Sequence, residues 1–300
     1  MQSNNPVFRR SEEFNRSNSY GNPTYQGNGA PYQGYGASQT QYQGYAPPQQ
    51  GYDEHGRVVP PPAQTGGGRM TIDTVVQSTA ITLGVVLVVA AATWFLTPAI
   101  EDEAAVGTIG LAVMLGAGAA FILSLVNSFK RVVSPGLVIA FAVAEGVALG
   151  ALSKLYDAMF TTPDSAFGGI VVQAVVGTFA AFAGTLAAYK FFDIKVGNKF
   201  RTFVVAAMFG MVALGLMELV LSLFSSQLGL FGFGPMGLIF SVVGLVLGVF
   251  MLILDFDFVE QGIANGLPAR ESWRASFGLL VSLVWIYTNL LRILAILQQD

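Results

Sequence analysis

Three acidic side chains crowd the end of a long apolar run: Asp255, Asp257 and Glu260. The run begins near Gly234 and carries no charge before Asp255. Acids in or beside hydrocarbon are costly and are seldom retained without a partner or a function. Carboxylate oxygens are also the ligands that hard cations such as calcium prefer. This stretch therefore predicts either a cation path or an ion pair at one end of a membrane-spanning helix.

Helix geometry separates the first two of these acids. Successive helical residues turn by about 100°, so Asp255 and Asp257 would point nearly opposite ways. We expect Asp255 to face the bundle interior near the cytoplasmic end of its span, with Asp257 and Glu260 facing away at the interface. Arg131, beside Lys130, starts another span at the same level. A latch between Asp255 and Arg131 is therefore predicted, which protonation of Asp255 would weaken.

Three further charges interrupt apolar segments: Glu145, Glu218 and Arg292. Glu145 falls about ten residues into its span, close to the predicted midplane. Glu218 and Arg292 fall at similar depths in two different spans. Opposite charges at one depth in lipid tend to pair, so a structural ion pair between them is predicted. Arg292 has an alternative, which is to extend its guanidinium to the membrane surface.

The elements that must position these charges are seven apolar segments, each near the 20 residues that a helix needs to cross about 30 Å of hydrocarbon. Helices are expected because unpaired backbone groups are not tolerated in lipid. Glycines four apart, as in Gly146 with Gly150 and Gly244 with Gly248, favour close helix packing. The sequence predicts an all-α protein with transmembrane helices near 74–96, 105–126, 135–156, 168–190, 202–224, 234–256 and 275–297.

Composition narrows the function classes. Of 300 residues, 53% are hydrophobic and 11% are charged, which is typical of a multi-span membrane protein. The net charge of −3 argues against a nucleic-acid partner. The sequence has no cysteine and one histidine, His55, so it cannot assemble a zinc hydrolase site from these ligands. We expect no enzyme activity and no cofactor, calcium being considered only as a transported ion.

Residues 1–68 differ in character from residues 69–300, the predicted transmembrane domain. They are rich in Gln, Gly, Tyr and Pro and repeat a Tyr-Gln-Gly unit at residues 25–27, 32–34 and 42–44. Such a segment buries too little apolar surface to offset the entropy of ordering. A disordered cytoplasmic tail is predicted, which serves either as a solvated tether or as a weakly self-associating segment.

Orientation follows from the distribution of Lys and Arg between loops. Basic residues precede the first span and recur in the second, fourth and sixth loops, whereas acids dominate the first and third loops. This alternation predicts a cytoplasmic N-terminus and a C-terminus outside the cell.

Three short motifs lie in order along the chain: Glu145-Gly146-Val147-Ala148-Leu149-Gly150, Leu254-Asp255 and Asn289-Leu290-Leu291-Arg292. Together they resemble the Bax inhibitor-1/YccA-like family of membrane proteins, which carries the transmembrane BAX inhibitor motif. The resemblance covers residues from about 70 to 300. Residues 5–9 are also similar to the tail of actinobacterial members.

This resemblance implies a bundle of six helices around a central seventh, and a pH-sensitive calcium leak. In such relatives two aspartates, on the sixth and seventh helices, are held against a basic residue. The sixth-helix aspartate carries over to Asp255, and the basic residue to Arg131. The seventh-helix position falls at Ser282, or at Ile286 in another register, and neither can ionise. The two-carboxylate sensor is therefore incomplete here, and Asp257 would replace it only from the wrong helix face.

Two functions remain open from the sequence. The first is a passive, pH-sensitive cation leak for calcium, with Glu145, Asp255 and Asp257 along the path. The alternative is a non-transporting regulator that binds a membrane protease or another envelope partner. Both place the protein in the lipid bilayer of a bacterial plasma membrane, and the oligomeric state is left open.

Overall fold

The computed structural model of the chain describes residues 51–52, 58–59, 68–100, 102–161, 168–192, 194–224 and 228–299. The chain divides into two units, Met1–Gly68 and Arg69–Asp300. In the first unit, β1 (Gly51–Tyr52) pairs antiparallel with β2 (Val58–Val59). The predicted disorder of residues 1–68 concerns a segment that lies almost entirely outside the described residues.

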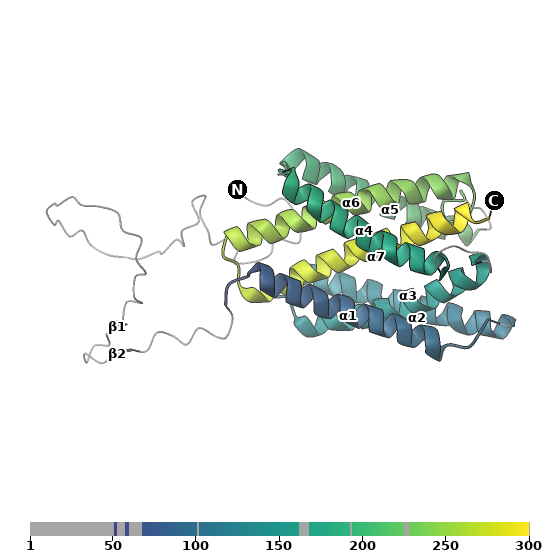
Figure 1. Cartoon of the computed structure of the whole chain (residues 1–300), viewed down its shortest axis with the longest axis horizontal. Helices are drawn as coiled ribbons and strands as arrows, with labels where there is room; N and C mark the ends of the chain where they lie inside the picture. Colours follow the sequence, from purple (N-terminus) through teal and green to yellow (C-terminus); the bar gives the residue numbers. More distant parts are fainter. Residues whose placement is uncertain are drawn as a thin grey trace. The chain divides into compact units, whose positions relative to one another are not determined.

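The second unit is helical, as the sequence predicts. Within its described residues, seven helices are long and apolar enough to cross a membrane. A short 3-10 turn, η2 (Ala269–Glu271), precedes the last helix. The seven helices, which Figure 1 shows, are α1 (Ile72–Leu96), α2 (Glu103–Phe129), α3 (Pro135–Phe160), α4 (Ile170–Phe191), α5 (Asn198–Ser222), α6 (Pro235–Ala264) and α7 (Ser272–Leu297).

Local sequence explains where several helices begin. The Thr71 hydroxyl accepts from the backbone N–H of Thr74 at the start of α1, and the Thr74 hydroxyl accepts in return from the Thr71 N–H. The Asp102 carboxylate caps α2 by accepting from the Ala105 N–H at 2.8 Å. Proline opens α3 and α6, where its missing N–H costs nothing. These caps satisfy backbone donors that have no partner within the first turn.

The greatest departure from the predicted spans is at the end of α6. The sequence predicts an end near residue 256, where acids begin, but the helix continues to Ala264. It continues because the acids have partners on other helices: Asp257 binds Arg201, and Glu260 binds Tyr189. Hydropathy therefore marks the end of the apolar run and not the end of the helix.

Helix α7 is the most buried of the seven and lies centrally, running in yellow through the middle of the bundle in Figure 1. It packs directly against α1, α3, α4 and α6. Helices α2 and α5 pack chiefly on the outside of α3 and α6, respectively. The central seventh helix that the family resemblance implies is thus confirmed, and α1, α3, α4 and α6 make its main contacts.

The two glycine pairs lie at close helix crossings. A Cβ on Gly146 would lie 2.7 Å from the Cβ of Val89 on α1, and one on Gly150 would meet the Ala90 backbone of the same helix. On α6, a Cβ on Gly248 would lie 2.7 Å from Ile286 Cγ1 of α7. Small residues therefore set the α1–α3 and α6–α7 crossings, as their spacing predicts.

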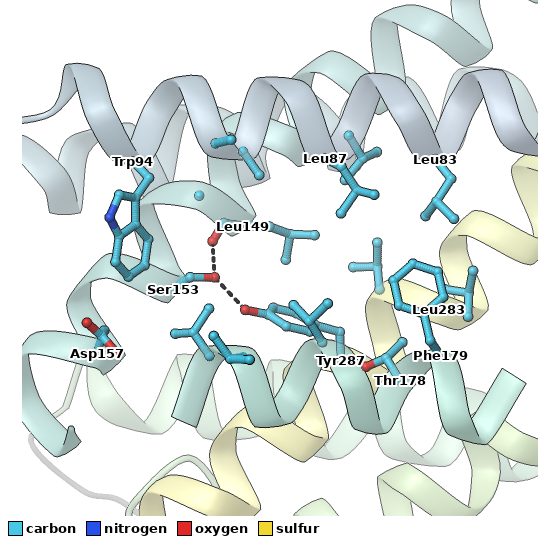
Figure 2. A pocket seen from close by; sticks show the side chains of 18 of the residues that line it. Leu83, Leu87, Trp94, Leu149, Ser153, Asp157, Thr178, Phe179, Leu283 and Tyr287 are labelled. Carbon is cyan, nitrogen blue, oxygen red and sulfur yellow. Dashed lines mark hydrogen bonds between the residues drawn. The ribbon is translucent and has the colours of Figure 1, made fainter. Parts of the chain in front are cut away.

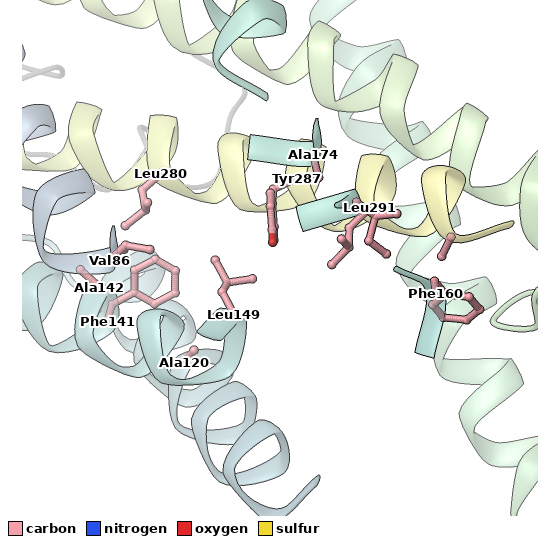
Figure 3. Packing of buried hydrophobic residues seen from close by; sticks show 12 residues of the cluster. Val86, Ala120, Phe141, Ala142, Leu149, Phe160, Ala174, Leu280, Tyr287 and Leu291 are labelled. Carbon is pink, nitrogen blue, oxygen red and sulfur yellow. The ribbon is translucent and has the colours of Figure 1, made fainter. Parts of the chain in front are cut away.

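The hydrophobic core lies where α7 packs against α3, with further side chains from α1, α2 and α4 (Figure 3). Phe141 of α3 meets Phe277 of α7 edge to face, with ring centroids 5.0 Å apart. Further along, Ser153 of α3 lies 2.6 Å from the hydroxyl of Tyr287 on α7. These two contacts join α3 and α7 at two levels. Residues 142–152 of α3 therefore lie at about the same level as residues 278–286 of α7.

Candidate functional site: charges around the central helix

Asp255 of α6 faces α7 and is half-buried. The Ser282 hydroxyl donates a hydrogen bond to Asp255 Oδ2 at 2.5 Å. Directly beside it, a Cβ on Gly278 would lie 2.9 Å from Asp255 Oδ1, so α7 leaves room for the carboxylate only because residue 278 lacks a side chain. The carboxylate is therefore enclosed at the α6–α7 contact by a hydroxyl and a glycine.

Asp255 lies deeper than the sequence predicts. It is nine residues, about 14 Å, before the end of α6 at Ala264, and not at the cytoplasmic end of the helix. Its partner Ser282 is ten residues into α7. Asp255 lies deeper because α6 extends to Ala264, beyond the end that the sequence predicts near residue 256.

The predicted contact between Asp255 and Arg131 is not formed in the described part of the chain. The Arg131 carbonyl accepts from the Arg274 guanidinium at 2.9 Å, which places Arg131 near the start of α7. Ser282 is eight residues further along α7, or about 12 Å deeper. Since Asp255 lies at the level of Ser282, this difference in depth separates it from Arg131.

Glu145 of α3 lies at about the level of Ser282 on α7. It falls between Phe141 and Ser153 on α3, as Ser282 falls between Phe277 and Tyr287 on α7. Its side chain is half-buried, and no hydrogen bond or ion pair joins it to another described residue. Two carboxylates, Glu145 and Asp255, therefore occupy one level of the bundle on two helices that both pack against α7.

Asp257 has the opposite environment from the one predicted. It is 7% exposed, and Arg201 of α5 donates to its Oδ2 at 2.6 Å. Gln261, one helical turn further, donates to the same oxygen at 2.7 Å. The prediction that Asp257 faces away from the bundle is wrong, because α5 packs on that side of α6 and brings the Arg201 guanidinium to the Asp257 carboxylate. Asp257 has a structural role as the anchor of α5.

A second buried ion pair lies at the same end of the bundle and was not singled out from the sequence. Arg274 Nε donates to Glu271 Oε2 at 2.7 Å, and both residues are buried. The spacing of three residues at a helix start was the available signal. Since Arg274 also binds the Arg131 carbonyl, this pair ties the start of α7 to the loop before α3.

Glu218 and Arg292 do not form the predicted ion pair within the described residues. The Glu218 carboxylate accepts from the backbone N–H groups of Leu228 and Gly229 at 2.9 and 3.0 Å. Arg292 donates to the Leu230 and Gly232 carbonyls and lies 5.5 Å from the centre of the Phe231 ring. Each charge binds the loop before α6, because that loop offers backbone donors to the acid and acceptors to the base.

Among the described residues, no group of three or more acidic or histidine side chains could hold a metal ion. The site consists instead of single carboxylates, each on a different helix surface. Such an arrangement suits transient contact with a cation more than tight retention, since calcium sites use six to eight oxygen ligands.

The fold and these intramembrane charges define a multi-pass α-helical membrane protein. Residues 5–299 match the family described as Bax inhibitor 1 like, so the chain belongs to that family. The match begins at residue 5, and the resemblance is therefore not limited to residues from about 70 onward. The chain is also 26% identical, over 168 residues, to an uncharacterized protein of Chlamydia muridarum (strain MoPn / Nigg). That alignment covers 53% of this chain and 64% of the relative.

Proposed function

We propose that the protein is a passive, pH-sensitive cation leak, with calcium as the expected ion, in a bacterial plasma membrane. The observation that carries this proposal is the pair of carboxylates at one level of the bundle. Asp255 is hydrogen-bonded to a neutral hydroxyl, and Glu145 has no bonded partner among the described residues. Acids at such positions are costly and point to a function when no cation neutralises them.

Asp255 acts here as a ligand and not as one half of an ion-pair latch. A serine hydroxyl donates to an ionised carboxylate and can accept from a protonated one. The Asp255–Ser282 contact therefore survives protonation, while the negative charge that attracts a cation does not. We expect the leak to grow as the pH rises and Asp255 ionises, whereas loss of an Asp255–Arg131 latch would make it grow as the pH falls.

Calcium entry into liposomes that contain the purified full chain tests this proposal between about pH 6 and about pH 8. The variants Asp255→Asn and Glu145→Gln should each reduce the flux, and Asp255→Asn should also flatten its pH response. Asp73→Asn is the matched control, because this acid lies exposed in the first turn of α1. Flux that is unchanged in both core variants would show that these carboxylates do not line the path.

The alternative, a non-transporting regulator, is supported by the way the start of the helical unit is held. The Met70 N–H donates to the Leu267 carbonyl at 2.7 Å, and Arg69 bridges to Pro268. Met70 itself is 2% exposed and packs beside Gly262 of α6. A partner that binds residues 1–68 would therefore act on the loop between α6 and α7.

The same liposome experiment distinguishes the cation leak from the non-transporting regulator. A parent protein that passes no calcium at any pH, with or without residues 1–68, would reject the leak and favour the regulator. A membrane protease or another envelope protein recovered with the full chain but not with residues 69–300 would then identify the partner.

A further inference from the structure

A groove of ≈ 390 Å³ opens between α1 and α4, with α3 and α7 forming its floor (Figure 2). Both α1 and α4 pack against α7, and the groove is the space left between them. It contains none of the carboxylates of the proposed cation path. Its lining includes Leu83, Leu87, Trp94, Leu149, Ser153, Asp157, Val175, Phe179, Leu283 and Tyr287.

The groove opens toward the bilayer. Its rim residues Leu87, Val172 and Phe179 are 44%, 48% and 41% exposed on helices that are long and apolar enough to cross a membrane. At this depth the surroundings are the hydrocarbon tails of lipids, and water has little access. An occupant must therefore be predominantly apolar and must come from the membrane.

The length of the groove matches one leaflet. Leu83 and Trp94, which lie at its two ends in Figure 2, are eleven residues apart on α1. That separation corresponds to about 16 Å, close to half of the ~30 Å hydrocarbon thickness. An extended acyl chain of a single lipid fits this span and the narrow, apolar lining.

Apart from the Thr178 hydroxyl, the polar side chains of the lining lie toward one end, where α1 and α3 finish. Ser153, Asp157 and Trp94 lie together there in Figure 2, and the Ser153 hydroxyl donates to the Leu149 carbonyl at 2.5 Å while it lies 2.6 Å from the Tyr287 hydroxyl. Asp157 is three residues from the end of α3, so we expect it near the level of the lipid headgroups. The groove is therefore amphipathic along its length, as a membrane lipid is.

The polar end carries an acidic side chain. Asp157 is the one acidic side chain among the described residues that line the groove, and it accepts from the Thr161 hydroxyl at 2.6 Å. The nearby Lys154 ammonium is directed to the carbonyls of Trp94 and Thr97, at 2.8 and 2.7 Å. It thus caps α1 and leaves Asp157 to attract a positive group.

We propose that this groove binds one acyl chain of a bilayer phospholipid whose headgroup carries an ammonium, which lies at Asp157. The lipid belongs to the leaflet on the side where α1 ends. Its chain covers Leu149, Val175 and Leu283 and completes the contact between α1 and α4. This lipid site is independent of the cation path.

Photocrosslinking in vesicles of phosphatidylethanolamine and phosphatidylglycerol tests the site. The full chain is reconstituted with phosphatidylethanolamine that bears a diazirine in its acyl chain, and labelled residues are mapped by mass spectrometry. We expect labels to concentrate on groove residues such as Leu83 and Val175. Equal labelling of Met114, a lipid-facing residue of α2 that is 64% exposed, would show ordinary annular lipid and overturn the proposal.

A pair of adjacent substitutions sharpens this test. Val175→Trp fills the groove and should reduce labelling there by about tenfold. Val176→Trp, on the 62% exposed neighbouring position outside the groove, should leave it unchanged. Leu87→Trp fills the groove from α1 and replaces Val175→Trp if that variant does not fold. Retained labelling in a folded groove-filling variant would reject the site.

The headgroup assignment is tested with a matched phosphatidylglycerol probe. The parent should label more strongly with the ammonium-bearing lipid, and Asp157→Asn should abolish that preference without removing the label. Equal labelling of the parent by both probes would reject the role of Asp157.

Discussion

Ser282 on α7 donates a hydrogen bond to Asp255 on α6 at 2.5 Å, and it is one of the two positions, with Ile286, at which the family resemblance implies a second aspartate. Asp255 thus contacts α7 through a neutral hydroxyl and not through an ionisable partner. Because a hydroxyl is both donor and acceptor, this contact tolerates either protonation state of Asp255. A change in pH therefore alters the charge at this level without breaking the α6–α7 contact.

A second carboxylate at Ser282 should create a pH switch. In Ser282→Asp two acids would face each other and titrate as a coupled pair, so their mutual repulsion would separate α6 from α7 once both ionise. We expect a steeper dependence of calcium flux on pH than in the parent, measured in liposomes. Ser282→Ala is the control, since it removes the hydrogen bond without adding a charge. An identical pH response in the aspartate and alanine variants would contradict this expectation.

Asp257→Asn should destabilise the protein, because Arg201 would lose its anionic partner in a mostly buried place. The two side chains are 11% and 21% exposed, and we expect a loss of about 1–2 kcal/mol in the free energy of unfolding. A double-mutant cycle with Arg201→Gln, followed by unfolding in detergent, measures the coupling. Glu260→Gln serves as the comparison, since Glu260 is exposed and bonded to the Tyr189 hydroxyl. Additive losses for Asp257 and Arg201 would mean that the pair contributes nothing.

The C-terminus should lie outside the cell. Arg69, Arg131 and Arg274 gather at the end of the bundle where α1 and α7 begin, as the contacts of Met70 and Arg274 show. An odd number of crossings then places the end of α7 on the opposite side. A reporter that is active only in the cytoplasm, fused after Asp300, should give no signal, whereas fusion before Met1 should give one. A strong signal from the C-terminal fusion would reverse the predicted orientation.

The sequence predicted the spans far better than the charge pairs, for a physical reason. Apolar length and glycine spacing are local properties, so the seven helices and the contacts of Gly146 and Gly248 followed from them. A pair such as Asp257–Arg201 depends on which helix packs beside α6, and a single sequence does not encode that in any local pattern. The partners of Glu218 are harder still to predict, because they are backbone N–H groups of a loop, which every residue type except proline provides.

Matched glycines on α2 should separate packing from helix propensity. A Cβ on Gly116 would lie 2.7 Å from the Ala148 backbone nitrogen of α3, whereas one on Gly118 meets nothing within 4 Å. Gly116→Val should therefore cost about 1–3 kcal/mol of stability, and Gly118→Val should cost little. Thermal unfolding in detergent compares the two. Equal midpoints would show that α2 and α3 are not packed this closely.

Exchanging the charges of Glu218 and Arg292 should not rescue the single substitutions. Glu218 accepts from the N–H groups of Leu228 and Gly229, and Arg292 donates to the carbonyls of Leu230 and Gly232. In Glu218→Arg with Arg292→Glu, a cation would face backbone donors and an anion would face backbone acceptors, so both positions become repulsive. Each single neutral variant, Glu218→Gln or Arg292→Gln, should cost about 1–3 kcal/mol. The swapped protein should be less stable than either of them, as measured by unfolding in detergent. Recovery of stability in the swap would instead indicate a direct ion pair between the two side chains.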